Sequence, residues 1–168
     1  MNVMRMPKIR KVVVNMGVGE SGEILEKAEN LLKEVTQQKP IRTKAKRTNR
    51  EFGIRKGEPI GVKVTLRREK AEQFLERAIE SVEKTMHAKS FDNKGNFAFG
   101  VKEHIDLPGV KYDPTVGIFG MDVAVTLERP GYRIKRRKKE KKSIHHHDYI
   151  SQEEAIAFMK DHFEVNII

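Results

Sequence analysis

The amino-acid sequence predicts an α+β fold: a mostly antiparallel sheet with two long helices on one face and the other face left open. Residues 59–67 alternate apolar and polar side chains, which is typical of a strand with one buried face. Residues 69–89 repeat apolar side chains at the spacing of an amphipathic helix. Segments of both kinds follow one another along the chain, and two helices against one sheet make a two-layer α+β sandwich.

Length and composition limit the classes of protein to consider. A chain of 168 residues suits one domain with an appended segment, and we expect an α+β domain over 1–132 and a tail over 133–168. The net charge of +10 indicates an anionic partner. The absence of cysteine excludes disulfides and thiolate metal sites. No apolar run suits a membrane span or a signal peptide, so we expect a soluble intracellular protein without membrane contact.

The first third of the chain alternates between strand and helix. Residues 8–16 are expected to form a strand well inside the sheet, because valines occupy 12–14. Gly17 ends that strand, and a helix with one apolar stripe follows and stops at Pro40. A short strand over 41–44 then leads into a long basic segment.

The middle of the chain predicts one more helix and two more strands. The helix is expected over 69–89, and a turn rich in Asp, Asn and Gly follows at 92–96. Alternation predicts strands over 97–105 and 118–128. The segment 106–117 between them is rich in Pro and Gly and is expected to be a loop.

The last segment begins with a basic run over 133–142 and ends with a short helix. Such runs are commonly disordered until they meet a polyanion. Ser151 and Glu154 have the spacing of a capping box, and an amphipathic helix follows them. The generic candidates for contact with RNA phosphates are Arg133, Lys135, Arg136, Arg137 and Lys138.

The basic segment 44–58 and the strand after it are the main candidates for function. The segment is longer than packing requires, and it is strongly cationic. The strand over 59–67 presents Lys63, Thr65 and Arg67 on its free side. A solvated basic surface explains less well why the loop and the free strand face are basic together. We therefore expect the two to bind a polyanion.

Phe52 and Ile54 lie within the cationic loop and outside any apolar period. An aromatic side chain between arginines can stack on a base or ribose while the arginines hold phosphates. Alternatively, Phe52 and Ile54 pin the loop to the core of the protein. The sequence leaves both interpretations open.

The turn Gly17–Gly22 formally fits the G-x-G-x-x-G pattern of a dinucleotide-binding enzyme. The context does not support an enzyme, because residues 39–44 are basic where an apolar strand ending in Asp or Glu is required. Glu20 would also lie where the phosphates must approach. Exposed N–H groups of this turn could instead hold an RNA phosphate.

The consecutive histidines 145–147 suggest a metal site only superficially. Consecutive side chains cannot all point at one ion on a regular element, so we expect a solvated or RNA-facing segment. No nucleophile–base pair follows from residue spacing. We therefore expect a protein that is not an enzyme and has no metal, cofactor or small-molecule substrate.

Four motifs carry a resemblance to a known family. They are KVVVNMGVGESG, QKPIRTKAKRTNREFGIRKGEPIGVKVTLR, SFDNKGNFAFGVKEHIDLPGVKYDP and GIFGMDVAVTLERPGYR. Together they resemble the L5 family of large-subunit ribosomal proteins in its archaeal form. The resemblance covers nearly the whole chain in the family's order.

The resemblance implies a non-enzymatic component of the cytoplasmic ribosome. It would bind 5S rRNA, attach it in the central protuberance and also contact large-subunit rRNA. The family's contacts with 5S rRNA map onto Asn15, Gly17, Gly19, Lys63, Thr65 and Arg67. The tip of the family's extended loop, which reaches toward the P-site tRNA, maps onto Arg47, Arg50, Phe52, Ile54 and Arg55.

The resemblance further implies contact with a small-subunit head protein of the S13 family, as a bridge between subunits. One position departs from the family motif, because Arg68 stands where glycine usually follows TLR. This departure leaves open which backbone conformation the chain adopts in the turn at Arg68. A free RNA chaperone or regulator, with no place on the ribosome, is the alternative from another class.

Overall fold

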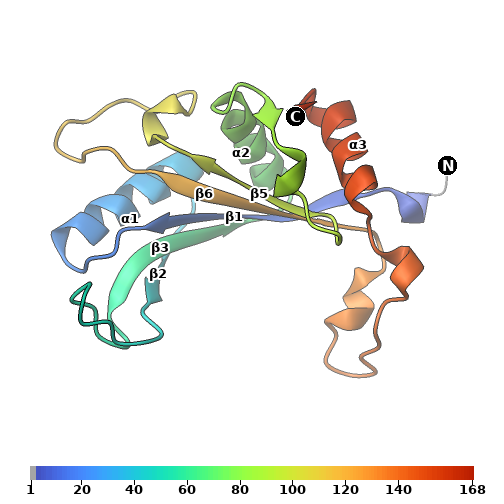
Figure 1. Ribbon diagram of the computed structural model, residues 1–168, viewed down its shortest axis with the longest axis horizontal. Helices are drawn as coiled ribbons and strands as arrows, with labels where there is room; N and C mark the ends of the chain where they lie inside the picture. The colour runs from blue at the N-terminus through green and yellow to red at the C-terminus, as the bar shows by residue number, and fades with distance from the viewer. Residues whose placement is uncertain (1–2) are drawn as a thin grey trace.

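The computed structural model describes residues 3–168 and confirms the α+β class. Its five-stranded sheet has the order β2-β3-β1-β6-β5, and every neighbouring pair in it is antiparallel (Figure 1). The strands of this sheet are β1 (Lys8–Gly17), β2 (Ile41–Lys44), β3 (Pro59–Leu66), β5 (Asn96–Val101) and β6 (Met121–Glu128). The helices are α1 (Glu23–Thr36), α2 (Glu69–Glu80) and α3 (Gln152–Phe163). A second, parallel pair joins β4 (Thr85–Met86) and β7 (Asn166–Ile167).

The valine-rich strand β1 lies at the centre of the sheet, as the sequence predicts. Alternation determines its two faces, because successive side chains of a strand point to opposite sides. Val12, Val14 and Met16 are buried on the helical side, whereas Val13 and Asn15 lie on the other side and are only partly covered.

Helices α1 and α2 cover one face of the sheet, and no α-helix of residues 3–168 covers the opposite face (Figure 1). Each helix buries one apolar stripe against the sheet, which is the main source of its stability. The buried residues of these stripes are Leu25, Ala28, Leu31, Leu32 and Val35 in α1, and Ala71, Phe74, Leu75, Ala78 and Ile79 in α2.

The predicted helix over 69–89 is too long, because α2 ends at Glu80. Glu83 and Lys84 both have φ of 54°, so the chain reverses there instead of continuing as a helix. Thr85–Met86 then pairs with Asn166–Ile167 from the C-terminal end of the chain. A long-range strand pairing thus replaces the last two turns that apolar spacing predicted.

The predicted strands over 97–105 and 118–128 are also too long. β5 ends at Val101, and β6 begins at Met121. His104 is buried within a short 3-10 helix beyond β5, and its backbone N–H donates to Phe119 O at 2.9 Å. His104 Nδ1 accepts from Phe119 N–H at 3.3 Å. Because the Phe119 N–H donates to the His104 side chain, the two segments do not continue the backbone hydrogen-bond ladder of β5 and β6.

Arg68 is the N-cap residue of α2 and has φ of 56° and ψ of −141°. This conformation suits glycine and strains a residue with a Cβ atom, at a cost of about 1–3 kcal/mol. We therefore expect Arg68→Gly to raise the free energy of unfolding by about 1 kcal/mol, after the entropy of the more flexible unfolded glycine is subtracted. Chemical denaturation of both proteins measures this difference.

Arg68→Ala is the matched control, because it removes the charge and the long side chain but keeps the Cβ atom. We expect no gain in unfolding free energy for that variant. Equal stabilisation by both substitutions would show that the arginine side chain, and not the backbone, is the source of the strain.

The C-terminal segment packs back onto the main core. Ser151 accepts from the Glu154 N–H and the Glu154 carboxylate accepts from the Ser151 N–H, so the predicted capping box is confirmed. Ile150, Ala155 and Met159 are fully buried in the same apolar cluster as the sheet. α3 therefore has a fixed place at one end of the sheet (Figure 1).

Candidate nucleic-acid interface

One row of directly paired residues crosses all five strands on the open face. Cross-strand partners lie on the same side of a sheet, so the pairing defines the row. Asn15 pairs with Lys63 on one side and with Asp122 on the other. Lys63 also pairs with Ile41, and Asp122 pairs with Gly100. The predicted RNA-binding residues Asn15 and Lys63 are thus direct neighbours.

A second row runs beside the first and consists of small or neutral side chains. Thr65 pairs with Val13, Val13 with Ala124, and Ala124 with Ala98. Within residues 3–168, the side chains of Asn15, Lys63 and Thr65 make no hydrogen bond or ion pair with the protein. They are available to a ligand that approaches the open face.

The other predicted contacts of this set lie at the rim of the face. Gly17 is exposed at the end of β1, whereas its partner Gly61 is buried, with Thr43 Oγ1 2.9 Å from the position of an added Cβ atom. Arg67 is exposed directly after β3 ends. Gly19 differs, because its N–H and that of Val18 both donate to Ile60 O, at 2.8 and 3.1 Å. These two N–H groups of the glycine turn are therefore not free to hold a phosphate.

Within the basic loop 44–58, residues 45–57 continue the β2–β3 hairpin as a narrower extension. Ala45 exchanges backbone hydrogen bonds with Glu58 and Gly57 at its base, and Asn49 and Ile54 exchange two more at 2.8 and 2.9 Å. Gly53, with φ of 66°, closes the tip. The loop thus has its own ladder and projects from the sheet (Figure 1).

The side chain of Phe52 is 72% exposed at the tip of this loop. The interpretation in which Phe52 pins the loop to the core is therefore wrong, and Ile54 also lies outside the apolar cluster. Arg47, Arg50 and Arg55 are exposed around Phe52. The tip thus presents an aromatic ring among cations.

Glu58 joins the base of the loop to the glycine turn. Its Oε1 accepts from Ser21 Oγ at 2.7 Å, and its Oε2 accepts from the Arg55 N–H at 2.9 Å. The Ser21 hydrogen bond, and next the Arg55 N–H, lower the pKa of Glu58 below its ordinary value. The ionised carboxylate of Glu58 is thus the form that makes these hydrogen bonds at the base of the loop.

This pKa predicts how the loop responds to acid. Because the folded pKa lies below the unfolded one, the stabilisation is complete above the unfolded pKa and is lost as the pH falls through the folded value. We expect Glu58→Ala to accelerate hydrogen exchange at the Arg55 amide several-fold at neutral pH. Amide exchange measured by NMR checks this.

Glu51→Ala serves as the control, since Glu51 lies in the same loop and its carboxylate has no internal partner among the described residues. Exchange at Arg55 should match the unmodified protein in that variant. Equal acceleration in both variants would mean that the charge of the loop, and not the Glu58 hydrogen bonds, determines hydrogen exchange at the base of the loop.

The basic tail uses part of its charge internally. Arg136 pairs with the buried Glu128 at 2.7 Å, and Arg137 pairs with Glu140 at 3.7 Å. Lys135 lies over the rings of Tyr132 and Tyr149. Of the five predicted phosphate contacts, Arg133 and Lys138 are thus the ones whose side chains have no internal partner in the described chain.

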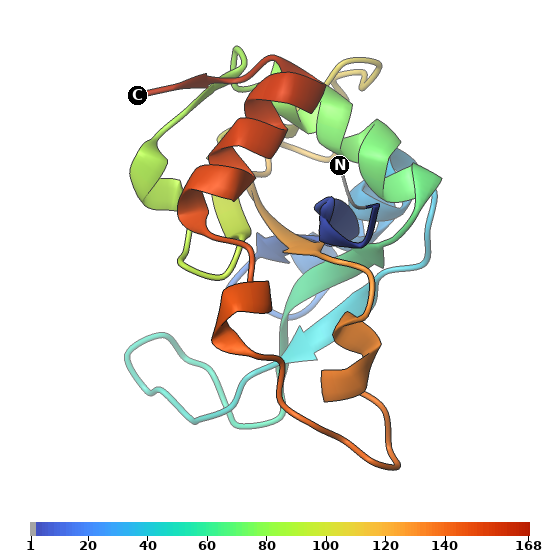
Figure 2. The same ribbon diagram turned by 90° about the vertical axis from the view of Figure 1, so that its right-hand side faces the viewer.

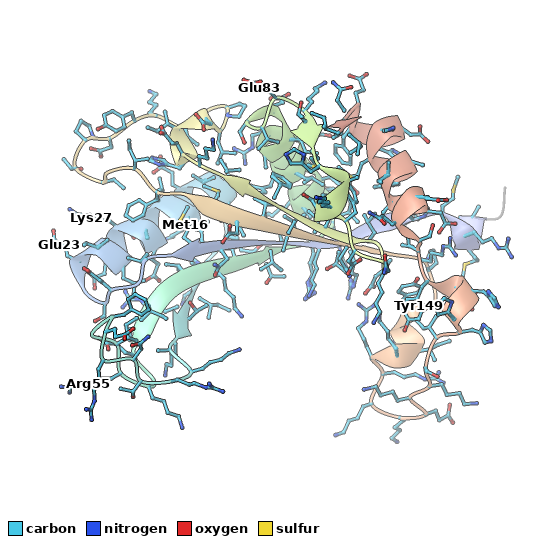
Figure 3. All side chains as sticks on the ribbon, in the orientation of Figure 1. Met16, Glu23, Lys27, Arg55, Glu83 and Tyr149 are labelled. Carbon is cyan, nitrogen blue, oxygen red and sulfur yellow. The ribbon has the colours of Figure 1, made fainter. Side chains whose placement is uncertain are left out.

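Tyr132 fixes the path of the tail by donating from its hydroxyl to Asp148 O at 2.6 Å. The basic run of the tail and the basic loop both lie on the open side of the sheet, at opposite ends (Figures 1 and 2). Figure 3 labels Arg55 in the loop and Tyr149 in the tail, with the open face between them. The face is therefore a saddle with a basic segment at each end.

The helical layer has the opposite charge. α1 and α2 each carry four glutamates against two basic residues, and α3 carries three acidic residues against one lysine. A net positive protein thus concentrates cations on the open side and acids on the helical side. A polyanion is attracted to the saddle and repelled by the helices.

Within residues 145–147, the rings of His145 and His147 stack 5.0 Å apart, and the ring of His146 meets that of His147 edge-on. Within the described residues, no group of three or more His, Cys, Asp or Glu is arranged to hold a metal ion. Across residues 3–168, no helix combines the length and apolarity that a membrane crossing needs.

Sequence reasoning missed the contribution of β6 to the open face. Asp122, Ala124 and Thr126 alternate with the buried residues of that strand and lie on the open side. Alternation in the sequence already implied this placement. The sequence did not reveal the strand order, in which β6 lies beside β1.

Comparison with known proteins gives matches over nearly the whole chain. The family model described as "Ribosomal protein L5" matches residues 2–55, and the model for the C-terminus of the same ribosomal family matches 59–158. A protein of Sulfolobus acidocaldarius is 54% identical over 167 residues, covering 99% of this chain and 94% of that relative. A Methanosphaera stadtmanae protein is 50% identical over 167 residues, 99% of each chain. Both relatives are named large ribosomal subunit protein uL5.

Proposed function

Because the chain belongs to the L5 family of large-subunit ribosomal proteins, we propose that its open sheet face binds 5S rRNA. Membership of the family, in its archaeal form, makes the chain a structural constituent of the large ribosomal subunit and not an enzyme. It also gives the chain a place on the cytoplasmic ribosome, which a free chaperone lacks. The bound 5S rRNA is attached in the central protuberance.

One observation carries this proposal: the sheet face without helices displays unpaired polar and cationic side chains between two basic segments. Lys63 and Arg67 neutralise phosphates and release counterions. Asn15 and Thr65 add hydrogen bonds that orient the RNA, and the saddle selects its shape. The acidic helices keep RNA from the other side.

Equilibrium binding to 5S rRNA, tRNA and an unrelated RNA of equal length, at matched near-physiological salt, tests the proposal. We expect 5S rRNA to bind at least about tenfold more tightly than the unrelated RNA. Equal affinities would mean that the open face binds any polyanion without selecting 5S rRNA, and would overturn the proposal.

The basic loop makes a separate contact with the P-site tRNA. Its support is the exposed Phe52 ring among Arg47, Arg50 and Arg55 at the end of a projecting hairpin. An exposed ring of this kind stacks on bases or sugars, at about 1–3 kcal/mol per stacked base. The loop lies away from the row that binds 5S rRNA.

We expect Phe52→Ala to lower P-site tRNA affinity of ribosomes about tenfold and leave the affinity of the isolated protein for 5S rRNA unchanged. Filter binding of tRNA to ribosomes carrying the variant measures the first quantity. Loss of 5S rRNA affinity in the isolated variant would refute this division of labour.

The remaining contacts follow the division of the chain into 1–132, with the projecting loop 44–58, and 133–168. The basic tail contacts large-subunit rRNA, chiefly through Arg133 and Lys138, whose side chains have no internal partner in the described chain. The first part also contacts a small-subunit head protein of the S13 family, as a bridge between the subunits.

A further inference from the structure

Asp122 is an exposed carboxylate on β6, in a row of the open face whose other members are neutral or cationic. It lies directly opposite Asn15 on β1, and its Oδ1 lies 3.8 Å from the position that a Cβ atom of Gly100 would occupy. Within residues 3–168, its side chain has no hydrogen bond or ion pair. Yet the protein carries 34 Lys and Arg residues that could have supplied one.

The other carboxylate on this side of β6 belongs to Glu128 and has a structural role. Glu128 is largely buried and pairs with Arg10 at 3.4 Å and with Arg136 at 2.7 Å. It holds the tail against the sheet. Asp122 makes no such ion pair within the described protein, so packing does not explain why a carboxylate occupies this position.

A phosphate is the wrong ligand for Asp122, because like charges repel. A carboxylate accepts hydrogen bonds, so its complement is a donor. Two strand spacings, about 10 Å, separate Asp122 from Lys63 across the row. The two side chains therefore meet different groups of a bound RNA instead of one phosphate.

The positions around Asp122 allow close approach. Gly100 and Ala98 lie beside it on β5, and Ala124 follows on the same face of β6. None of these three carries a side chain beyond a methyl group. The edge of a sugar or base can therefore reach the carboxylate without displacing larger side chains.

We propose that Asp122, oriented beside Asn15, accepts a hydrogen bond from a donor on the edge of the bound RNA. The donor is a ribose 2′-hydroxyl or an exocyclic amino group of a base. The row then binds a phosphate at Lys63 and a sugar or base edge at Asp122. This inference rests on the proposed 5S rRNA binding and makes Asp122 a determinant of its specificity.

The role predicts effects of opposite sign on two ligands. Asp122→Ala should weaken 5S rRNA binding about tenfold, because a hydrogen bond to a charged group is lost. The same variant should bind inorganic polyphosphate a few-fold more tightly, because a repelling charge is removed. Asp122→Asn keeps one acceptor oxygen and should recover part of the 5S rRNA affinity.

Asp161→Ala, on the acidic helical layer, makes the same change of charge away from the face and should alter neither affinity by more than about twofold. Tighter binding of both ligands by Asp122→Ala would mean that Asp122 only repels RNA, and would overturn the inference. Unchanged affinity for 5S rRNA would overturn it as well.

Chemically altered 5S rRNA separates the two donors. Substituting 2′-deoxy nucleotides removes the hydroxyl. The exocyclic amino group is removed by inosine in place of guanosine, purine riboside in place of adenosine, or zebularine in place of cytidine. In a double-mutant cycle, the RNA substitution that removes the donor should cost affinity for the unmodified protein but not for the Asp122→Ala variant. If neither substitution shows coupling to Asp122, the inference is wrong even where the unmodified protein still prefers 5S rRNA. A lack of that preference in the unmodified protein would instead refute the proposed function.

Discussion

Lys63→Glu is expected to weaken 5S rRNA binding about 100-fold at near-physiological salt. The substitution removes a phosphate contact at the centre of the open face and places a negative charge against the RNA backbone, which costs several kcal/mol. Lys63 is exposed between Ile41 and Asn15 and has no internal partner in the described chain. The fold should therefore tolerate the change.

Lys33→Glu is the matched control. Lys33 is exposed on α1 and makes no ion pair among the described residues, so reversal there changes the net charge equally on the helical side. We expect only a few-fold loss of affinity from the long-range field. Equal losses would contradict the assignment of the face.

The milder variant Lys63→Ala gives a second readout. If Lys63 neutralises one phosphate, the slope of log K against log salt should flatten by up to about 0.9. An unchanged slope would remove Lys63 from the interface.

Gly95→Ala is expected to lower the free energy of unfolding by about 2–5 kcal/mol, as the sum of backbone strain and overpacking. Gly95 has φ of 75°, where an added Cβ atom is strained by about 1–2 kcal/mol. That atom would also lie 2.7 Å from Ile150 Cβ, which is fully buried ahead of α3. Overpacking of this kind adds about 1–3 kcal/mol.

Gly109→Ala isolates the contribution of the backbone. Gly109 has φ of 85°, but no atom lies within 4 Å of its added Cβ position. Chemical denaturation should show a loss of about 1–2 kcal/mol for this control. A similar loss for Gly95→Ala would mean that Ile150 moves aside freely and that α3 is only loosely held.

The sequence predicted the parts of the fold that local periodicity determines. The alternation at 59–67 and the valines of 12–14 indicated β3 and the central position of β1. The same alternation placed Lys63 and Thr65 on the free side. Cross-strand neighbours could not be predicted, so the row that joins Lys63, Asn15 and Asp122 became visible only with the strand order.

The errors come from contacts between distant segments. Val82 and Met86 continue the apolar spacing of α2, but pairing of β4 with β7 extends the chain at that point. Likewise, composition showed a uniform basic run after residue 132. The structure divides that run into side chains with internal partners, such as Arg136, and side chains without one in the described chain, such as Arg133.

Amide chemical shifts of the protein, recorded with and without 5S rRNA, test the central claim most directly. The claim predicts large shift changes on the open face, at Val13, Asn15, Lys63 and Ala124, and small changes along α1 and α2. Changes concentrated on the helices, with the open-face amides unaffected, would contradict it.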